Sequence, residues 1–303
     1  MKIEFYKLQA SGNDFILLDN IKSKNKFSIG FYKNFAKKYC SRKLGIGADG
    51  ALMIQPSKKA DFKMRIFNPD GSEAEMCGNG ARCVGLWAYL ASQRKNVKFE
   101  TKAGIIEAKI GVKNKTTLVK VKTSIPVGLK VNLPLKILGR KIKVNFINTG
   151  VPHAVIFVQG LDKIDVNKIG REIRFHKQFK PAGTNVNFVE IKGDNSIKVR
   201  TYERGVETET LACGTGSLAS AMISWLKLNP EIKQKNLISM FVTTKSKDVL
   251  KVTFSVPAKG WSASGRKGGS ASGGDDKAEI DNVWLEGKAY LIYQGIIKEG
   301  VGT

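Results

Sequence analysis

Two short segments of this sequence place a cysteine directly before a glycine-rich turn. They are Cys77-Gly78-Asn79-Gly80 and Cys213-Gly214-Thr215-Gly216. In both places the residues that follow have the apolar spacing of a helix, so each cysteine is predicted at a helix N-terminus. The unpaired N–H groups and partial positive charge there favour a thiolate. The glycines let the backbone approach a ligand, and the same amides can hold a carboxylate.

The presence of two such thiols suggests a specific chemistry. A thiolate beside a bound carboxylate can remove the neighbouring proton, and a thiol on the opposite face can return one to the planar carbanion. That is a two-base inversion of configuration, which uses one Cys⁻ and one Cys–SH in each turnover.

Other interpretations of the cysteines remain open. Free cysteines are usually small buried hydrophobes, and this is the interpretation preferred for Cys40 and Cys83, which lie outside the duplicated turns. A disulfide between Cys77 and Cys213 would be an oxidised, inactive form. No metal site is predicted, because Cys77 and Cys83 lack zinc-type spacing and the chain has only 2 histidines.

The segments around the two cysteines repeat each other. A strand-like segment at 64–67 leads through a turn to Cys77, and one at 199–202 leads through a turn to Cys213. Two further pairs of segments look alike, residues 12–16 with 185–189 and residues 100–104 with 242–245. The chain is therefore interpreted as two related halves, each of which contributes one cysteine.

Many short strands and few helices favour an α+β fold over a doubly wound sheet. Strands are expected near 3–8, 15–19, 105–110, 118–121 and 143–147, with a helix near 31–39. The domain prediction is residues 1–125 with Cys77, residues 126–280 with Cys213, and residues 281–303 as last strands that cross back to the N-terminal half. A Gly/Ser-rich stretch at about 258–274 is interpreted as a flexible surface loop, because it cannot bury enough surface to offset its ordering entropy.

The composition excludes several classes of protein. The chain has 303 residues, of which 42% are hydrophobic and 25% charged, as in ordinary globular proteins. No apolar run approaches the ~18 residues of a membrane span, and no secretory signal is visible at the start. Four cysteines are too few for a disulfide framework. A cytoplasmic protein with no membrane partner is therefore expected.

The charge is a poor guide to function. Lys and Arg number 51 against 26 acids, which gives a net charge of +25. This balance is typical of a nucleic-acid binder, but 41 of the basic residues are Lys and only 10 are Arg. Base readout and bidentate phosphate binding favour Arg. Specific nucleic-acid binding is therefore not predicted, although a basic binding protein stays as the alternative from another class.

Seven ordered motifs, taken together, resemble the diaminopimelate epimerase family over nearly the whole chain. The motifs are Gly12-Asn13-Asp14-Phe15, Phe67-Asn68-Pro69-Asp70-Gly71-Ser72, Glu75-Met76-Cys77-Gly78-Asn79-Gly80, Gly150-Val151-Pro152-His153, Asn185-Val186-Asn187-Phe188, Tyr202-Glu203-Arg204-Gly205 and Leu211-Ala212-Cys213-Gly214-Thr215-Gly216. The resemblance implies two pseudo-symmetric domains, each a mostly antiparallel sheet wrapped around a central helix. It also implies interconversion of LL- and meso-diaminopimelate, for lysine and cell-wall synthesis, without pyridoxal phosphate or metal, and a homodimer.

The resemblance also assigns roles to residues. Cys77 and Cys213 would be the two acid/base groups, helped by His153 and Glu203. The amides of the two glycine-rich turns would hold the reacting carboxylate, and polar side chains would bind the rest of the substrate. The residues implied in substrate binding are Asn13, Asn68, Gly78, Asn79, Asn187, Glu203, Arg204, Gly214 and Thr215.

The sequence departs from the family pattern at four places. Val151 stands where many members have a substrate-contacting Asn, and Gly50 stands where some have Gln. The turn at 205–210 is one residue longer than the common form, and the stretch at 258–274 is not typical. Because racemases of other amino acids share this architecture, an isomerase of the same fold with another carboxylate substrate remains the nearer alternative.

Overall fold

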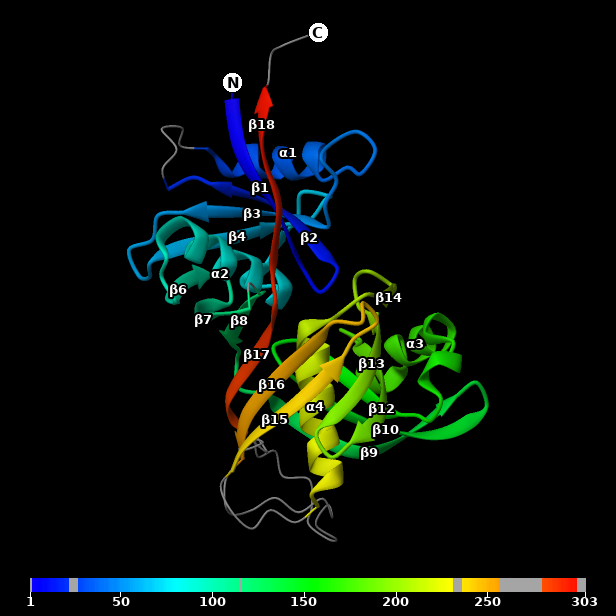
Figure 1. The fold of residues 1–303 in the computed structure, drawn as a ribbon. Helices are drawn as coiled ribbons and strands as arrows, with labels where there is room; N and C mark the ends of the chain where they lie inside the picture. The colour runs from blue at the N-terminus through cyan, green and yellow to red at the C-terminus, as the bar shows by residue number, and fades with distance from the viewer. Residues whose placement is uncertain (1, 22–26, 115, 231–235, 257–279, 299–303) are drawn as a thin grey trace. The chain divides into compact units, whose positions relative to one another are not determined.

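The computed structural model describes residues 2–21, 27–114, 116–230, 236–256 and 280–298 (Figure 1). The chain forms two compact units. Unit 1 comprises residues 1–122 and 287–303, and unit 2 comprises residues 123–286. The Gly/Ser-rich stretch at 258–274 lies outside the described residues.

Unit 1 is a mixed, mostly antiparallel sheet in the strand order β18-β1-β2-β3-β4-β6-β7-β8. Only the β2–β3 and β4–β6 pairs are parallel, and the short β5 pairs with β4. The strands are β1 (Lys2–Ala10), β2 (Asn13–Asp19), β3 (Gly50–Gln55), β4 (Phe62–Phe67), β5 (Glu73–Ala74), β6 (Asn96–Thr101), β7 (Gly104–Lys113), β8 (Thr116–Lys122) and β18 (Tyr290–Lys298). The helices are α1 (Ile29–Tyr39) and α2 (Gly78–Ser92).

Unit 2 repeats this order as β9-β10-β11-β12-β13-β15-β16-β17. Its parallel pairs are β11–β12 and β13–β15, and the short β14 pairs with β13. The strands are β9 (Val127–Ile137), β10 (Arg140–Asn148), β11 (Pro152–Phe157), β12 (Asn185–Gly193), β13 (Ser196–Glu203), β14 (Thr208–Thr210), β15 (Asn236–Thr243), β16 (Val249–Val256) and β17 (Asp281–Lys288). The helices are α3 (Val166–Arg174) and α4 (Gly214–Leu228), with 3₁₀ turns at Leu161–Lys163 and Lys177–Phe179.

The matching strand orders show which residues of the two units are equivalent. Strand β2 corresponds to β11 and β3 to β12, because each pair is parallel and is joined through an outer helix. One repeat proposed from the sequence was therefore wrong, since residues 12–16 reach into β2 whereas residues 185–189 lie in β12. The resemblance rested on a shared Asn-x-Phe pattern, and strand pairing overrides such a short pattern. The other proposed pair is consistent with β6 and β15.

The central helix of each unit is buried over most of its length. Helix α2 packs against β1, β2, β7, β8 and β18, and helix α4 packs against β10, β11, β12, β13, β15 and β16 (Figure 1). Small side chains in both helices let the strands approach closely. At Gly85 of α2, for instance, a Cβ atom would lie 2.7 Å from Cγ1 of Val119 on β8. The α+β class with sheets around central helices is thus confirmed.

The outer helices form a second apolar layer in each unit. Helix α1 contributes Tyr32 and Phe35 to one cluster of unit 1, and helix α3 contributes Val166 and Ile173 to the corresponding cluster of unit 2. Ser28 caps α1 by accepting a hydrogen bond from the Phe31 N–H. No helix among the described residues is long and apolar enough to cross a membrane.

Candidate active site: two capped helices with different surroundings

Cys77 is the N-cap residue of helix α2. Its backbone is extended, at φ −140° and ψ 122°, and its Sγ accepts a hydrogen bond from the Gly80 N–H at 3.5 Å. The thiol is half-buried. A sulfur atom in this position lies beside the partial positive charge of the helix N-terminus, which favours the thiolate. The amides of Gly78 and Asn79 lie in the first helical turn, where N–H groups have no intrahelical acceptor.

Cys213 occupies the equivalent position at helix α4. Its φ and ψ are −118° and 114°, and its Sγ accepts from the Gly216 N–H at 3.4 Å. The Thr215 hydroxyl lies 3.4 Å from the same sulfur. Cys213 is more enclosed than Cys77, with 8% of its surface exposed. The predicted position of both cysteines at helix starts is thereby confirmed.

A matched ion pair fixes the short strand before each thiol. Arg65 on β4 binds Glu73 on β5 through two hydrogen bonds of 2.7 and 2.8 Å. Arg200 on β13 binds Glu209 on β14 in the same way, at 2.6 and 2.8 Å. Bidentate pairs of this kind restrict orientation as well as distance. They therefore hold in place the short strand that leads to each cysteine.

The surroundings of the two helix starts differ in polarity. A Cβ atom at Gly80 of α2 would meet Leu52 Cδ2 at 3.2 Å and Phe15 Cζ at 3.7 Å, both of them apolar atoms. At Gly216 of α4 the nearest atom would be the Asn187 amide oxygen, close enough to exclude any side chain. The two helix starts thus share a backbone arrangement and differ in the side chains beneath it.

In unit 2 these side chains form a buried polar group. The Asn187 amide nitrogen lies 3.1 Å from the Ala154 carbonyl oxygen and 3.1 Å from His153 Nδ1, and its oxygen accepts from the Thr201 hydroxyl at 2.9 Å. Asn187 and His153 are both 0% exposed. Burial lowers the pKa of His153 to about 3, and the nearby Arg204 charge acts in the same direction. His153 is therefore neutral at physiological pH.

Glu203 and Arg204 end strand β13 beside this group. Burial raises the pKa of Glu203, although the Thr210 hydroxyl donates to its Oε2 at 2.9 Å. The Arg204 backbone N–H donates to the Asn185 side-chain oxygen at 2.8 Å, and the Asn185 amide donates to the Pro152 carbonyl at 3.1 Å. Asn185 thus joins the His153 strand to the turn that carries Arg204.

In unit 1, Asn13 and Asn79 are each bonded to a charged partner. The Asn13 amide donates to Asp49 Oδ2 at 3.1 Å, while the Asn13 oxygen is buried and has no hydrogen-bond partner among the described residues. The Asn79 oxygen accepts from Arg82 at 2.8 Å, and Arg82, which is 0% exposed, also donates to the Ser11 hydroxyl at 2.9 Å.

Asn68 lies in the exposed turn after β4, and its amide donates to Ser72 Oγ at 2.9 Å. The strand pairing makes Asn68 the counterpart of Glu203, since each residue directly follows or ends the strand that carries the bidentate arginine. The same position therefore carries an amide in unit 1 and a carboxyl group in unit 2.

The remaining cysteines belong to the apolar core. Cys40 is 2% and Cys83 is 0% exposed, and burial raises the pKa of both thiols, that of Cys40 to about 12. None of the four cysteines, all of which the structure describes, is joined in a disulfide. Within the described residues no group of three His, Cys, Asp or Glu side chains is placed to hold a metal ion.

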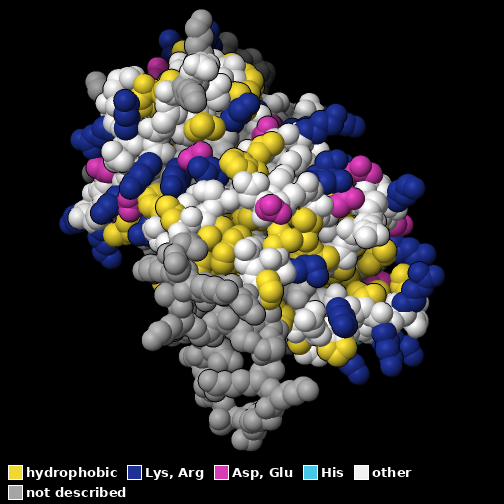
Figure 2. Space-filling model, turned by 60° about the horizontal axis from the view of Figure 1, so that its bottom comes forward, with side chains coloured by type: hydrophobic (Ala, Val, Ile, Leu, Met, Phe, Trp, Pro, Cys, Tyr) yellow, Lys and Arg dark blue, Asp and Glu magenta, His cyan; other side chains and the backbone are white. Residues whose placement is uncertain are grey.

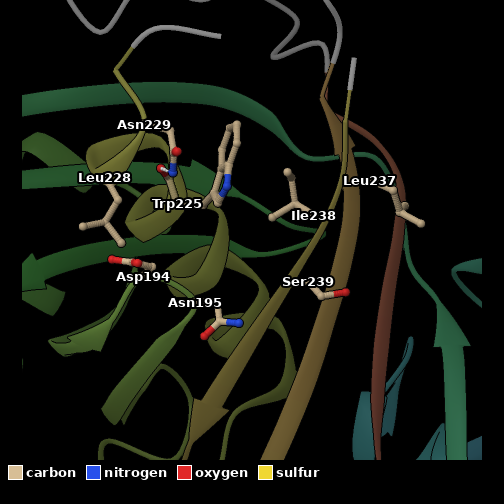
Figure 3. Close-up of a pocket in the computed structure, with 8 residues that line it drawn as sticks. All are labelled: Asp194, Asn195, Trp225, Leu228, Asn229, Leu237, Ile238 and Ser239. Carbon is tan, nitrogen blue, oxygen red and sulfur yellow. Dashed lines mark hydrogen bonds between the residues drawn. The ribbon is translucent and has the colours of Figure 1, made fainter. Parts of the chain in front are cut away.

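A cavity of about 400 Å³ lies elsewhere in unit 2, at the C-terminal end of α4 (Figure 3). Trp225 and Asn229 line it from the helix, and Ile238 lines it from β15. Twelve residues separate Trp225 from Cys213, or about 18 Å along the helix. The cavity is lined by neither a cysteine nor a histidine, so the thiol chemistry does not belong there.

The duplicated fold with a central helix in each half is shared with solved structures of proteins described as racemases, epimerases and isomerases. A phenazine biosynthesis protein of the PhzF family from Bacillus anthracis matches with a TM-score of 0.70 at 16% identity, over 98% of this chain and 99% of that one. A probable proline racemase from Agrobacterium radiobacter K84 matches with a TM-score of 0.66 at 13% identity, over 98% and 93%. At these identities the likeness concerns the fold alone.

Sequence comparison then identifies the family within this class. The diaminopimelate epimerase family profile matches residues 5–127 and 145–240. Diaminopimelate epimerase from Aquifex aeolicus is 40% identical over 99% of both chains. The enzyme of the same name from Methanocella arvoryzae is 46% identical over 74% of this chain and 82% of that one. This chain belongs to the diaminopimelate epimerase family, as the seven motifs predicted.

The sequence interpretation missed several residues that support the helix starts. The bidentate pairs had a visible signal, because an arginine stands three residues before Asn68 and again before Glu203. Arg82, Ser11 and Thr201 had none, because their roles depend on contacts between distant strands and helices. Asn185, next but one to Asn187, was included in a motif without a role.

Proposed function

We propose that this protein interconverts LL- and meso-diaminopimelate, with Cys77 and Cys213 as the two acid/base groups. The observation that carries the proposal is the repeated cap. In two units of the same strand order, a cysteine Sγ accepts the N–H of the third helical residue at the start of a central helix. Family membership supports the substrate, since its relatives bear the name of this activity.

The proposed reaction has two proton transfers. One cysteine thiolate takes the proton from the substrate Cα, so the C–H bond breaks and an S–H bond forms. The electron pair stays on the planar carbanion, which the neighbouring carboxylate helps to stabilise. The other cysteine then gives its proton to the opposite face of that carbon and becomes a thiolate. The products are the epimer and an enzyme in which the two protonation states are exchanged.

The reacting carboxylate would be held by backbone amides at the helix starts. Gly78 and Asn79 supply N–H groups at α2, and Gly214 and Thr215 supply them at α4. Such positions bind carboxylates well, because the amides and the helix dipole act together. Among the side chains, Asn13, Asn68, Glu203 and Arg204 would bind the second amino-acid end. Asn187 has all its amide atoms bonded within the protein, so we assign it an indirect role, argued below.

Isotope exchange tests the reaction class and the substrate together. The full-length reduced protein would be incubated with LL-diaminopimelate in D₂O without pyridoxal phosphate. We expect deuterium at Cα together with the meso isomer. The Cys83→Ala protein serves as the control, since Cys83 lies inside α2, six residues after Cys77, with 0% of its surface exposed. Meso product without deuterium would contradict the proton-transfer mechanism.

The main alternative is another amino acid as substrate. Val151 supports it, because this half-buried apolar residue stands two positions before His153, where an amide is common in the family. If the folded protein exchanges the Cα proton of another amino acid and not that of diaminopimelate, this alternative replaces the proposal. A Val151→Asn variant that gained the diaminopimelate activity would then identify the residue responsible.

We further propose a cytoplasmic homodimer without a specific nucleic-acid site. Lys and Arg are spread over the visible face with Asp and Glu among them, rather than gathered in one patch (Figure 2). On β18 of unit 1, Ile292 and Ile296 lie on one face and are 54% and 55% exposed, an apolar surface that a second copy could cover. Light scattering tests the dimer. A steep dependence of DNA binding on salt with a saturable, sequence-dependent site would contradict the last part of the proposal.

A further inference from the structure

The Asn187 amide is held in one orientation by a group that can only accept. The Ala154 carbonyl oxygen lies 3.1 Å from the Asn187 nitrogen, and a backbone carbonyl has no proton to give. Turning the amide over would bring two acceptor oxygens together. The Thr201 hydroxyl, 2.9 Å from the Asn187 oxygen, donates in the observed orientation. The amide nitrogen is therefore the atom that faces His153.

This orientation determines which nitrogen of His153 carries the proton. One Asn187 N–H donates to the Ala154 carbonyl oxygen. The other faces His153 Nδ1, which lies 3.1 Å from the Asn187 amide nitrogen. Nδ1 must accept this hydrogen bond, so in the neutral ring the proton resides on Nε2. The pKa of about 3, which burial causes, keeps the ring neutral. Among the described residues, Arg204 is the charged group whose field also lowers this pKa.

His153 Nε2 is buried and has no hydrogen-bond partner among the described residues. A buried donor without an acceptor is costly, and a catalytic role is one of the reasons for which a protein retains such a group. The register places His153 in the position that Phe15 has in unit 1, since Phe15 pairs with Gly50 and His153 with Asn185. The Phe15 ring reaches the first turn of α2. By the same register His153 lies beneath the first turn of α4, where Cys213 is the cap.

We infer that Asn187 is a positioning residue that fixes His153 as a neutral Nε2–H donor to the reacting group at Cys213. In this role His153 donates a hydrogen bond and takes no proton from the thiol. The inference rests on the proposed function and deepens it. It assigns the hydrogen-bond donor that polarises the reacting group to unit 2 alone. In unit 1 the equivalent residues are Phe15 and Leu52, which can neither donate nor accept.

Nitrogen NMR tests the tautomer directly in the full-length protein. The chain has only two histidines, so His176→Gln leaves His153 as the single imidazole signal. With ¹⁵N-histidine labelling we expect a protonated Nε2 and an unprotonated Nδ1, unchanged from about pH 5 to about pH 8. A proton on Nδ1, or a cationic ring in that range, would overturn the inference.

Two substitutions then test the part played by Asn187. Asn187→Leu introduces the residue found at the equivalent position 52, and we expect mixed tautomers with kcat lower by at least about ten-fold. KM should change much less, because the Asn187 amide atoms are already bonded within the protein. If that variant does not fold, Thr201→Val keeps the shape and removes only the hydroxyl donor to the Asn187 oxygen. An unchanged tautomer and kcat in a folded variant would remove Asn187 from this role.

The inference about the tautomer and the proposed function can be refuted independently of each other. If no substrate is epimerised while the Nε2–H tautomer is found, the proposed function is wrong and the role of Asn187 toward His153 stands. If diaminopimelate is epimerised while Nδ1 carries the proton, the proposed function stands and this inference is wrong.

Discussion

At the scale of single residues, the identical caps of Cys77 and Cys213 conceal different surroundings. Both sulfur atoms accept one helical N–H, yet the first turn of α2 lies against Leu52 and Phe15, and that of α4 against Asn187. An apolar and a polar environment affect a thiolate differently, because desolvation opposes charge and a hydrogen-bond donor supports it. The surroundings of the two thiols therefore stabilise a thiolate unequally, although both helix starts have the same local backbone structure.

Removing either thiol should nearly abolish epimerisation. General acid–base catalysis contributes about 10² to 10⁴-fold, so we expect Cys77→Ala and Cys213→Ala each to lower kcat by at least about a hundred-fold. Circular dichroism checks that the variants fold, and Cys83→Ala provides the comparison for loss of a buried thiol. A folded Cys77→Ala protein with the wild-type rate would rule out the two-base scheme.

The buried His153 should make the fold less stable in acid. Its folded pKa of about 3 lies below the unfolded value near 6.5, so between these values only the unfolded chain binds the proton. Stability present above about pH 6.5 should be lost as the pH falls, by up to about 1.4 kcal/mol per pH unit. Urea unfolding of wild type and His153→Gln at a series of pH values measures this. Parallel curves for the two proteins would contradict the assignment.

Glu203 should affect the pH dependence of stability in the opposite direction from His153. Burial raises its folded pKa, so the folded protein keeps this proton to higher pH than the unfolded chain does. The free energy of unfolding should therefore fall as the pH rises from the ordinary Glu value near 4.3 through the raised pKa. Glu203→Gln lacks this titration, and we expect its melting temperature to exceed that of wild type by a margin that grows over the same interval. A margin that does not vary with pH would show that the carboxyl group is not desolvated.

At the scale of elements, the two helix starts predict different responses to one substitution. Gly80 and Gly216 are both the third residue of a central helix, where alanine would add about 0.5–1 kcal/mol of helix propensity. At Gly80 the nearest atom to an added Cβ is the movable tip of Leu52, at 3.2 Å. At Gly216 it is the Asn187 oxygen, which three hydrogen-bonded groups hold in place.

We therefore expect Gly80→Ala to change stability by less than about 1 kcal/mol, and Gly216→Ala to cost about 1–3 kcal/mol. Urea unfolding midpoints measure the difference. Gly111→Ala on β7 serves as the control, because an added Cβ there meets nothing within 4 Å. Equal losses at Gly80 and Gly216 would mean that Asn187 can move aside, which would also weaken its assigned role.

Local patterns predicted the elements around the thiols better than they predicted the pairing of strands. The helices after Cys77 and Cys213 followed from apolar spacing, and the strands before them from alternation. The outer helix α3 was not predicted, and residues 12–16 were matched to the wrong strand. Both depend on the parallel pairs β2–β3 and β11–β12, which join segments far apart in the chain. Short sequence patterns carry no information on such pairs.

The same limit applies to Asn187, which the family resemblance placed on the substrate. Its motif lies in a strand, and alternation alone does not say which face meets the ligand. The structure places the side chain under α4 with every amide atom bonded. The motif was thus visible in the sequence, whereas the direction of the Asn187 side chain required the strand register.

At the scale of the whole molecule, unit 1 is built from both ends of the chain. Strand β18 pairs antiparallel with β1, from Lys298 opposite Lys2 to Tyr290 opposite Gln9. Ala289 and Leu291 pack on the core around α2, and the Tyr293 ring contacts Phe5 at 5.9 Å between centroids. The corresponding neighbour in unit 2 is β9, which is continuous in sequence with β10. Unit 1 therefore depends at this edge on a strand pair from opposite ends of the chain, whereas the corresponding pair in unit 2 is local in sequence.

A chain that ends at Lys288 should accordingly lose stability in unit 1 first. Without β18, the outer edge of β1 has no partner among the described strands, and its backbone groups exchange with solvent. Hydrogen exchange by mass spectrometry should show faster exchange in peptides from β1, while peptides from β10, its counterpart in unit 2, keep their protection. Because Cys77 lies in unit 1 and Cys213 in unit 2, loss of epimerisation with unit 2 still protected would show that one intact capped helix is not enough. Equal acceleration in β1 and β10 would instead mean that the two units unfold as one cooperative body.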